Sequence, residues 1–389
     1  MTERDAILGF IVAFAVAALL TPLTSRLARA VGAVDQPKER GLAEGGTPLL
    51  GGFAMLAAVL AGALLFLEFT TRTEDRLTGI LVGACVIAVI GAFDDKYDLH
   101  PAIKLAGQIV AATIPVQAGV EVTNITLPEP IGPQDLGDLG PPLTVLGLVA
   151  IMNVVNFSDG VDGLAAGICA ICAATFAVIA FDLDRNYAAI LAAVTAGAAL
   201  GFLVHNFPPA SAFMGDCGAN LLGLLLGCIA VEGAVKTQAV LALIFPLVVL
   251  AVPFVDTTFV VLKRLKYRRA PWQADANHFH HRFSRIGFST RKTILYLYAW
   301  ALMLAGFALA LRFVPYSDNH GNLEAGWSAL MGALGLVVLA ASVYLVYVLE
   351  ILKFNFRARR LTREQAQQAW ETGEFPAISE EDAQTSTRP

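Results

Sequence analysis

The chain has 389 residues, of which 56% are hydrophobic and only 15% are charged, and its formal net charge is −5. A soluble globular domain is usually about one quarter charged. This composition excludes an ordinary soluble protein. The net charge says little by itself, because the side of the membrane on which each charge lies matters more than the sum, and we predict a membrane setting with no nucleic-acid partner.

Long apolar stretches follow one another along the chain, each near the ~20 residues that a helix needs to cross a bilayer. Stretches of this length exclude barrel strands, and only closed barrels and helices span lipid, because unsatisfied backbone groups there are too costly. We therefore predict an all-α, multi-pass integral membrane protein with about eleven transmembrane helices. The stretches are 7–29, 49–69, 77–93, 102–118, 142–158, 163–181, 187–205, 217–232, 237–262, 293–313 and 326–352.

The distribution of Lys and Arg predicts the orientation of these helices, because cytoplasmic loops carry an excess of both residues. The first stretch is too long for a signal-peptide core and lacks a positive leader, so we expect it to stay in the protein. With the N-terminus outside, only six of the 27 Lys and Arg lie on the outer side. They are Arg4, Arg72, Arg76, Arg185, Lys236 and Arg312. We predict a plasma-membrane protein with a cytoplasmic C-terminus.

Two regions interrupt this pattern. The outer segment VEVTNITLPEPIGPQDLGDLGPP, residues 120–142, has Pro and Gly turns that favour a short hairpin. The polar residues 353–389 are predicted to be a partly disordered cytoplasmic tail behind one membrane domain, residues 1–352. None of the five cysteines lies in a predicted outer loop, so we expect no disulfide framework.

Polar residues gather in four clusters where the predicted spans end. Every cluster falls on the predicted cytoplasmic side, so we expect them to form one site. In chain order they are Asp94 and Asp95 in GAFDDKYDLHPAIK; Asn153, Asn156, Asp159 and Asp162 in NVVNFSDGVDGLAAG; Asn206, Phe213 and Asp216 in HNFPPASAFMGDCGAN; and His278, His280, His281 and Arg282 in PWQADANHFHHRFSRIG.

The second cluster carries carboxylates that need a positive partner. Asn153 and Asn156 share a helix face, and the glycines after them break the helix and let the backbone approach a ligand. A carboxylate at membrane depth costs about 2.5–3.5 kcal/mol. No Lys or Arg lies between residues 105 and 184, so the partner is elsewhere in the chain or is a metal. For Asp162 alone, capping of a helix start at the membrane surface remains an alternative.

The donor chemistry of the clusters favours Mg²⁺ or Mn²⁺, because hard oxygen ligands predominate. Zinc is the alternative at the histidines. No cysteine lies near them, and the adjacent His280 and His281 cannot easily both bind one ion. The basic residues 263–269 fit positive-inside anchors better than substrate ligands.

The motifs GAFDD, NVVNFSDGVDGLAAG, AFMGDCGANLLG and ADANHFHHR, in this order, resemble the polyprenyl-phosphate N-acetylhexosamine-1-phosphate transferases. The resemblance runs from about Asp35 to Arg291. The histidine loop is similar to that of the branch using UDP-N-acetylglucosamine, whereas the branch using UDP-MurNAc-pentapeptide has a run of adjacent histidines there. One departure is the first cytoplasmic loop, which keeps Arg40 but lacks the His that family members often carry.

The resemblance implies that polyprenyl phosphate attacks the β-phosphorus of a UDP-sugar and releases UMP at a cytoplasmic active site. It also implies roles for the clustered residues. Asp216 and Asn156 would hold Mg²⁺; Asp94 and Asp95 would position or deprotonate the lipid phosphate; Asp159, Asp162 and Asn206 would hold the nucleotide; Phe213 would stack on uracil; His280, His281 and Arg282 would meet the diphosphate or sugar; and Asn153 and His278 are further substrate-binding candidates. We count Asp159 and His281 with Asp94 and Asp95 among the catalytic candidates.

Several alternatives stay open at this point. The donor could be UDP-MurNAc-pentapeptide or another UDP-N-acetylhexosamine. An ion-coupled transporter would instead place polar groups near the midplane and often shows an inverted repeat, and neither is visible. A lipid-binding scaffold without activity gives no reason for so many acids beside a basic loop. The sequence does not determine the length of the prenyl chain or whether the protein forms a homodimer.

Overall fold

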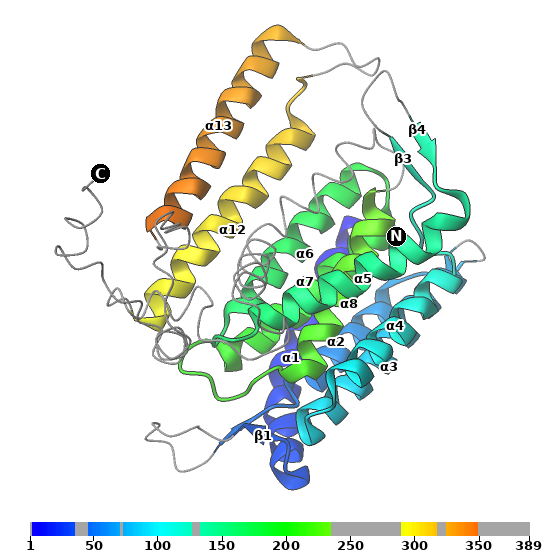
Figure 1. Cartoon of the computed structure of the whole chain (residues 1–389), viewed down its shortest axis with the longest axis vertical. Helices are drawn as coiled ribbons and strands as arrows, with labels where there is room; N and C mark the ends of the chain where they lie inside the picture. Colours follow the sequence, from blue (N-terminus) through cyan, green and yellow to red (C-terminus); the bar gives the residue numbers. More distant parts are fainter. Residues whose placement is uncertain are drawn as a thin grey trace, which may run out of the picture.

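The computed structural model describes residues 2–35, 46–70, 73–126, 133–234, 289–316 and 324–348. Within them the chain is a bundle of helices, shown in Figure 1. The helices are α1 (Glu3–Val31), α2 (Gly51–Phe66), α3 (Glu74–Tyr97), α4 (Pro101–Gln117), α5 (Gly140–Ser158), α6 (Leu164–Asp182), α7 (Asn186–Asn206), α8 (Gly215–Ala234), α12 (Thr290–Phe313) and α13 (Ala325–Val348), with a short 3-10 turn at Gly137–Leu139.

These helices confirm a multi-pass helical membrane protein. Eight of the described helices are long and apolar enough to cross a membrane. Every predicted stretch except 237–262 contains a helix, and that stretch lies outside the described residues, as does the tail 353–389. The count of about eleven spans and the external N-terminus therefore stay predictions.

Two short antiparallel strand pairs join the helices. β1 (Val34–Asp35) pairs with β2 (Thr47–Pro48) in the loop between α1 and α2. β3 (Asn124–Thr126) pairs with β4 (Pro133–Asp135) after α4. The second pair confirms the hairpin that the Pro and Gly turns of the outer segment predict.

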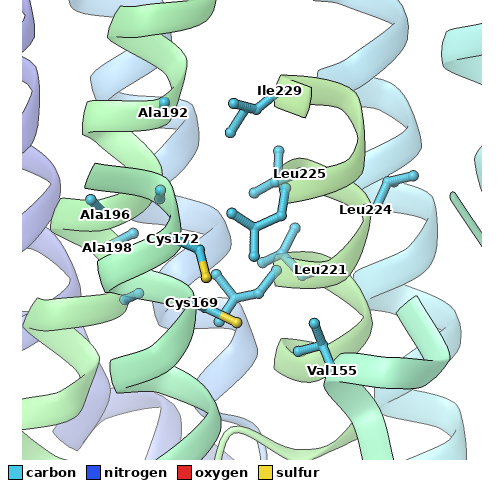
Figure 2. Packing of buried hydrophobic residues seen from close by; sticks show 14 of the residues in the cluster. Val155, Cys169, Cys172, Ala192, Ala196, Ala198, Leu221, Leu224, Leu225 and Ile229 are labelled. Atoms are coloured by element: carbon cyan, nitrogen blue, oxygen red, sulfur yellow. The ribbon is translucent and has the colours of Figure 1, made fainter. Parts of the chain in front are cut away.

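Helix α8 occupies the centre of the bundle and carries one site residue at its first turn. Its apolar window is 89% buried, against 28% for that of α1. Figure 2 shows leucines of α8, such as Leu221 and Leu225, packed beside Cys169 and Cys172 of α6. Small residues on the neighbouring helices let the backbones approach closely, as is common in membrane bundles. This packing places the start of α8 among the ends of several helices.

Ion pairs tie the helices together at the end of the bundle opposite Asp216. Arg76 of α3 lies 3.2 Å from Glu232 of α8, whose side chain is almost fully buried. Arg312 of α12 pairs with Asp182 of α6. Glu232 and Asp182 are thus each paired with an arginine at this end of the bundle.

Candidate active site

The side chain of Lys104 lies among oxygen atoms from three other helices. Its Nζ is 3.0 Å from Oδ2 of Asp94 and 3.2 Å from Oδ1 of Asn156, and it forms an ion pair with Asp216. Asn156 also donates a hydrogen bond from Nδ2 to Asp216. One ammonium group therefore contacts two carboxylates and one amide, which come from three of the four predicted polar clusters.

The chain direction of each helix brings these four residues to one end of the bundle. Asp94 lies in the last turns of α3 and Asn156 in the last turn of α5, whereas Lys104 and Asp216 lie in the first turns of α4 and α8. A tight turn reverses the chain between α3 and α4: Asp98 takes the left-handed conformation, and Oδ1 of Asp94 accepts a hydrogen bond from Leu99 N at 2.8 Å. This turn returns Lys104 to the side of Asp94.

Asp95 faces the backbone at the start of α8. Its Oδ1 accepts from Asp216 N at 2.7 Å, and its Oδ2 accepts from Cys217 N at 3.1 Å. A carboxylate at this place satisfies free N–H groups and complements the positive end of the helix dipole. Gly215 permits the contact, because its φ is +66° and a Cβ there would collide with the Asp95 carboxylate. Asp95 thus sets the position of Asp216, and its predicted role at the lipid phosphate stays a prediction.

The turn after α5 is joined to the turn after α7 by two side chains. Buried Asn206 accepts from Gly163 N at 2.8 Å and donates to Ala212 O at 2.9 Å. Asp162 accepts from Ala210 N at 3.0 Å. The left-handed Gly163, with φ +77°, begins α6 at this junction. Two predicted nucleotide residues therefore meet at the same pair of turns.

Asp159 belongs to the same group of acids. It follows the last residue of α5, and burial raises the pKa of its carboxyl well above the usual range, with further increases from the nearby charges of Asp216, Asp95 and Asp162. Burial is the main cause of this shift, and the neighbouring acids add to it in the same direction.

Phe213 is half-buried between the first loop and α8. Its N donates to Pro48 O at 2.8 Å, and its O accepts from Gly51 N at 3.1 Å. These contacts hold the end of the first loop, residues 47–52, beside the start of α8. Stacking of the Phe213 ring on a base stays a prediction.

Helix α12, which is distant in the sequence, contacts both the turn after α5 and the turn after α7. The hydroxyl of Tyr298 donates to Gly163 O, and Nε of Arg291 donates to Pro208 O at 2.9 Å. Because Asn206 accepts from the N–H of Gly163, both backbone polar groups of Gly163 are hydrogen-bonded to side chains. Sequence reasoning missed Tyr298 and Arg291, since both lie in a stretch read only as a span and its flank.

Lys104 is the principal residue that sequence reasoning missed. It stands just before the region 105–184 that contains no Lys or Arg, and Gln108 follows it by four residues on a mostly apolar helix. Polar residues four apart share one face of a helix, and this spacing could have identified Lys104 as a residue that faces other polar groups. The predicted His278, His280, His281 and Arg282 lie outside the described residues.

The oxygen atoms around Lys104 have the chemistry that Mg²⁺ prefers. Carboxylates of Asp94 and Asp216 and the amide of Asn156 already converge on one positive charge. Among the described residues, no group of three or more His, Cys, Asp or Glu is arranged to hold a metal. Two carboxylates and one amide oxygen are the kind of donors that Mg²⁺ takes when substrate phosphates and water complete its shell, and whether this protein binds the ion stays a prediction.

The fold and site define a class: a multi-pass helical membrane protein with a lysine-bridged acidic site at one end of its bundle. A family model described as glycosyl transferase family 4 matches residues 77–234, which include Asp94, Lys104 and Asp216. The chain is 35% identical over 306 residues to the probable undecaprenyl-phosphate N-acetylglucosaminyl 1-phosphate transferase of Bacillus subtilis, covering 79% of this chain and 85% of that protein. The chain belongs to glycosyl transferase family 4, as its motifs predict.

Two further relatives carry different names. The decaprenyl-phosphate N-acetylglucosaminephosphotransferase of Mycolicibacterium smegmatis is 34% identical over 316 residues, covering 74% of this chain and 78% of that protein. The phospho-N-acetylmuramoyl-pentapeptide-transferase of Halalkalibacterium halodurans is 30% identical over 329 residues, covering 80% of this chain and 98% of that protein. The names of these relatives refer to two different sugar phosphates.

Proposed function

We propose that this chain transfers N-acetylglucosamine-1-phosphate from UDP-N-acetylglucosamine to a polyprenyl phosphate, undecaprenyl or decaprenyl. The products are UMP and polyprenyl-diphosphate-N-acetylglucosamine. The convergence of Asp94, Asn156 and Asp216 on Lys104 is the observation that carries the proposal. The names of relatives at 34% and 35% identity support N-acetylglucosamine as the sugar.

In this reaction an oxygen of the lipid phosphate forms a bond to the β-phosphorus of the donor. The bond between that phosphorus and the oxygen bridging to the α-phosphorus breaks, and UMP leaves with the electron pair. Catalysis of phosphoryl transfer is mostly positioning and charge neutralisation. Lys104 would supply a fixed positive charge beside the diphosphate. A base is little needed, because a phosphate monoester is already mostly ionised at neutral pH.

We propose Mg²⁺ as the cofactor, with Mn²⁺ as the substitute. Asp216 and Asn156 would hold it, and Asp94 lies against the same ammonium group. When bound, the ion would neutralise charge on the phosphates. The protein's own part is to keep these oxygens together at the end of three helices.

The place of the site suits an acceptor whose phosphate lies at the membrane surface. The clustered residues lie at helix ends, where a lipid headgroup can reach them while its prenyl chain stays among the apolar spans. The Lys and Arg asymmetry supports the cytoplasmic face of the plasma membrane for this end of the bundle. The turns held by Asp162 and Asn206 would border the nucleotide.

Release of UMP by the purified protein tests the function. With polyprenyl phosphate and Mg²⁺ present, we expect UDP-N-acetylglucosamine to yield UMP and a lipid-linked sugar. Chelation should stop the reaction, and added Mg²⁺ should restore it. The pentapeptide donor is the control, because one relative of 30% identity is named for it. Turnover of UDP-MurNAc-pentapeptide alone would move the protein to that branch, and turnover of neither donor would contradict the proposed activity.

Tyr298→Phe should weaken the contact between α12 and the turn that carries Asp162. The change removes the hydroxyl that donates to Gly163 O and keeps the ring. A hydrogen bond of this kind contributes about 0.5–1.5 kcal/mol, so we expect a small fall in melting temperature and a loss in turnover of less than about tenfold. Tyr344→Phe, whose ring is exposed on α13, is the matched control. Identical melting temperatures and rates in both variants would contradict a role for this contact.

A further inference from the structure

A second layer of polar side chains lies one helical turn deeper in the bundle than Lys104, Asn156 and Asp216. Gln108 follows Lys104 by four residues on α4, and Asn220 follows Asp216 by four residues on α8. Helix α5 ends at the site, whereas α4 and α8 begin there. The deeper residue on α5 is therefore Asn153, which precedes Asn156 by three residues. Each amide therefore lies on the same helix face as a site residue and on its inner side.

Hydrogen bonds connect the three amides in a chain. Asn153 donates to Oε1 of Gln108 at 2.8 Å, and Gln108 donates to Oδ1 of Asn220 at 2.8 Å. Asn220 then donates to the backbone O of Asp216 at 2.8 Å. The side chains of Gln108 and Asn220 are only 1% and 2% exposed. This series of hydrogen bonds thus begins on α5, passes through α4 and ends on α8 at Asp216, which pairs with Lys104.

Amides constrain helix packing more narrowly than apolar side chains do. Apolar contacts tolerate small rotations and shifts of a helix, whereas a buried amide that loses its partner is left unsatisfied in a poorly solvated region. The bonds through Gln108 hold three helices at once. A rotation of α4 that moved Lys104 away from Asp216 would also break the contact between Gln108 and Asn220.

We propose that Gln108, Asn153 and Asn220 form a positioning network for the transfer reaction. The network holds α4, α5 and α8 at the rotation and depth at which Lys104 and Asn156 meet Asp216. These amides act through the site residues, and Gln108 and Asn220 need not touch substrate. The inference rests on the proposed function, because it assigns a purpose to the alignment of residues that this function uses.

Gln108→Leu tests the network, since it replaces the amide with an apolar side chain of comparable size and removes both hydrogen bonds. We expect kcat for UMP release to fall on the order of tenfold or more, because small displacements of catalytic groups are costly. We expect KM for UDP-N-acetylglucosamine to change less than kcat, because the turns that hold Asp162 and Asn206 keep their own hydrogen bonds.

Glu232→Gln is the structural control. It weakens the ion pair with Arg76 at the far end of α8, so it also disturbs an interhelical contact of this helix. We expect a lower melting temperature with kcat close to that of the wild type. If kcat fell equally in both variants at equal loss of melting temperature, the effect of Gln108 would be general destabilisation and the positioning role would be overturned.

An exchange of side chains keeps the test decisive where Gln108→Leu folds poorly. Gln108→Asn and Asn220→Gln each change the length of one side chain, and the double variant restores the combined length across the contact. We expect each single change to lower kcat and the double change to recover part of it, because the exchange restores the contact between positions 108 and 220 but not the one with Asn153. A double variant no faster than the single ones would contradict the network. Loss of the proposed function would appear differently, as absence of UMP release by the wild type itself.

Discussion

Asp216→Asn is expected to lower the rate of UMP release by about 100- to 1000-fold, the range found when a charge-stabilising group is removed from an active site. Asp216 pairs with Lys104 and accepts a hydrogen bond from Asn156. An amide keeps the size of the side chain but removes the negative charge that orients the ammonium group and would bind Mg²⁺. The measurement is UMP release at saturating substrates over a Mg²⁺ titration.

Asp182→Asn is the matched control for this substitution. Asp182 pairs with Arg312 at the opposite end of the bundle, so the same chemical change occurs far from the site. For Asp182→Asn we expect a rate close to that of the wild type. We expect both variants to insert normally into the membrane. Near-normal turnover of Asp216→Asn at every Mg²⁺ concentration would exclude Asp216 as a metal ligand.

Lys104→Met should have an effect of similar size, on the order of 100-fold or more. The substitution keeps a long apolar side chain but leaves the oxygens of Asp94, Asn156 and Asp216 without their shared cation. The two carboxylates then repel each other, and the substrate diphosphate loses a fixed positive neighbour. Lys104→Arg should recover part of the rate, because it restores the charge with a different shape.

Lys96→Met separates this effect from a general loss of positive charge at the same end of the bundle. Lys96 is exposed, and its Nζ lies 4.9 Å from the centre of the Tyr97 ring. We expect this variant to release UMP at nearly the wild-type rate. Equal losses at Lys96 and Lys104 would assign the effect to surface charge and remove Lys104 from the site.

Much of the fold could be predicted from the sequence because lipid imposes a strong constraint on it. Long apolar stretches must form helices, since the backbone cannot stay unpaired in the bilayer. The stretches at 77–93 and 142–158, for example, correspond to Glu74–Tyr97 and Gly140–Ser158. The same constraint places charged and amide side chains at helix ends, which is why the positions of Asp94, Asn156 and Asp216 already indicated one site.

The sequence by itself determined the class of fold, the polar clusters and the family. It did not determine the partners within the site, which depend on how the faces of different helices meet. Spacing of three or four residues shows which side chains share a face of one helix, but the rotation of that helix comes from packing against its neighbours.

Only the tertiary structure therefore decided that Lys104 is the cation for Asp216 and that Asp95 faces the start of α8. Gly91 illustrates the physical reason: a Cβ there would collide with the backbone of Cys217, so the absence of a side chain lets α3 and α8 approach closely. That close approach brings Asp95 within reach of the first N–H groups of α8. It is a property of two helices in contact, and the local sequence of either helix does not contain it.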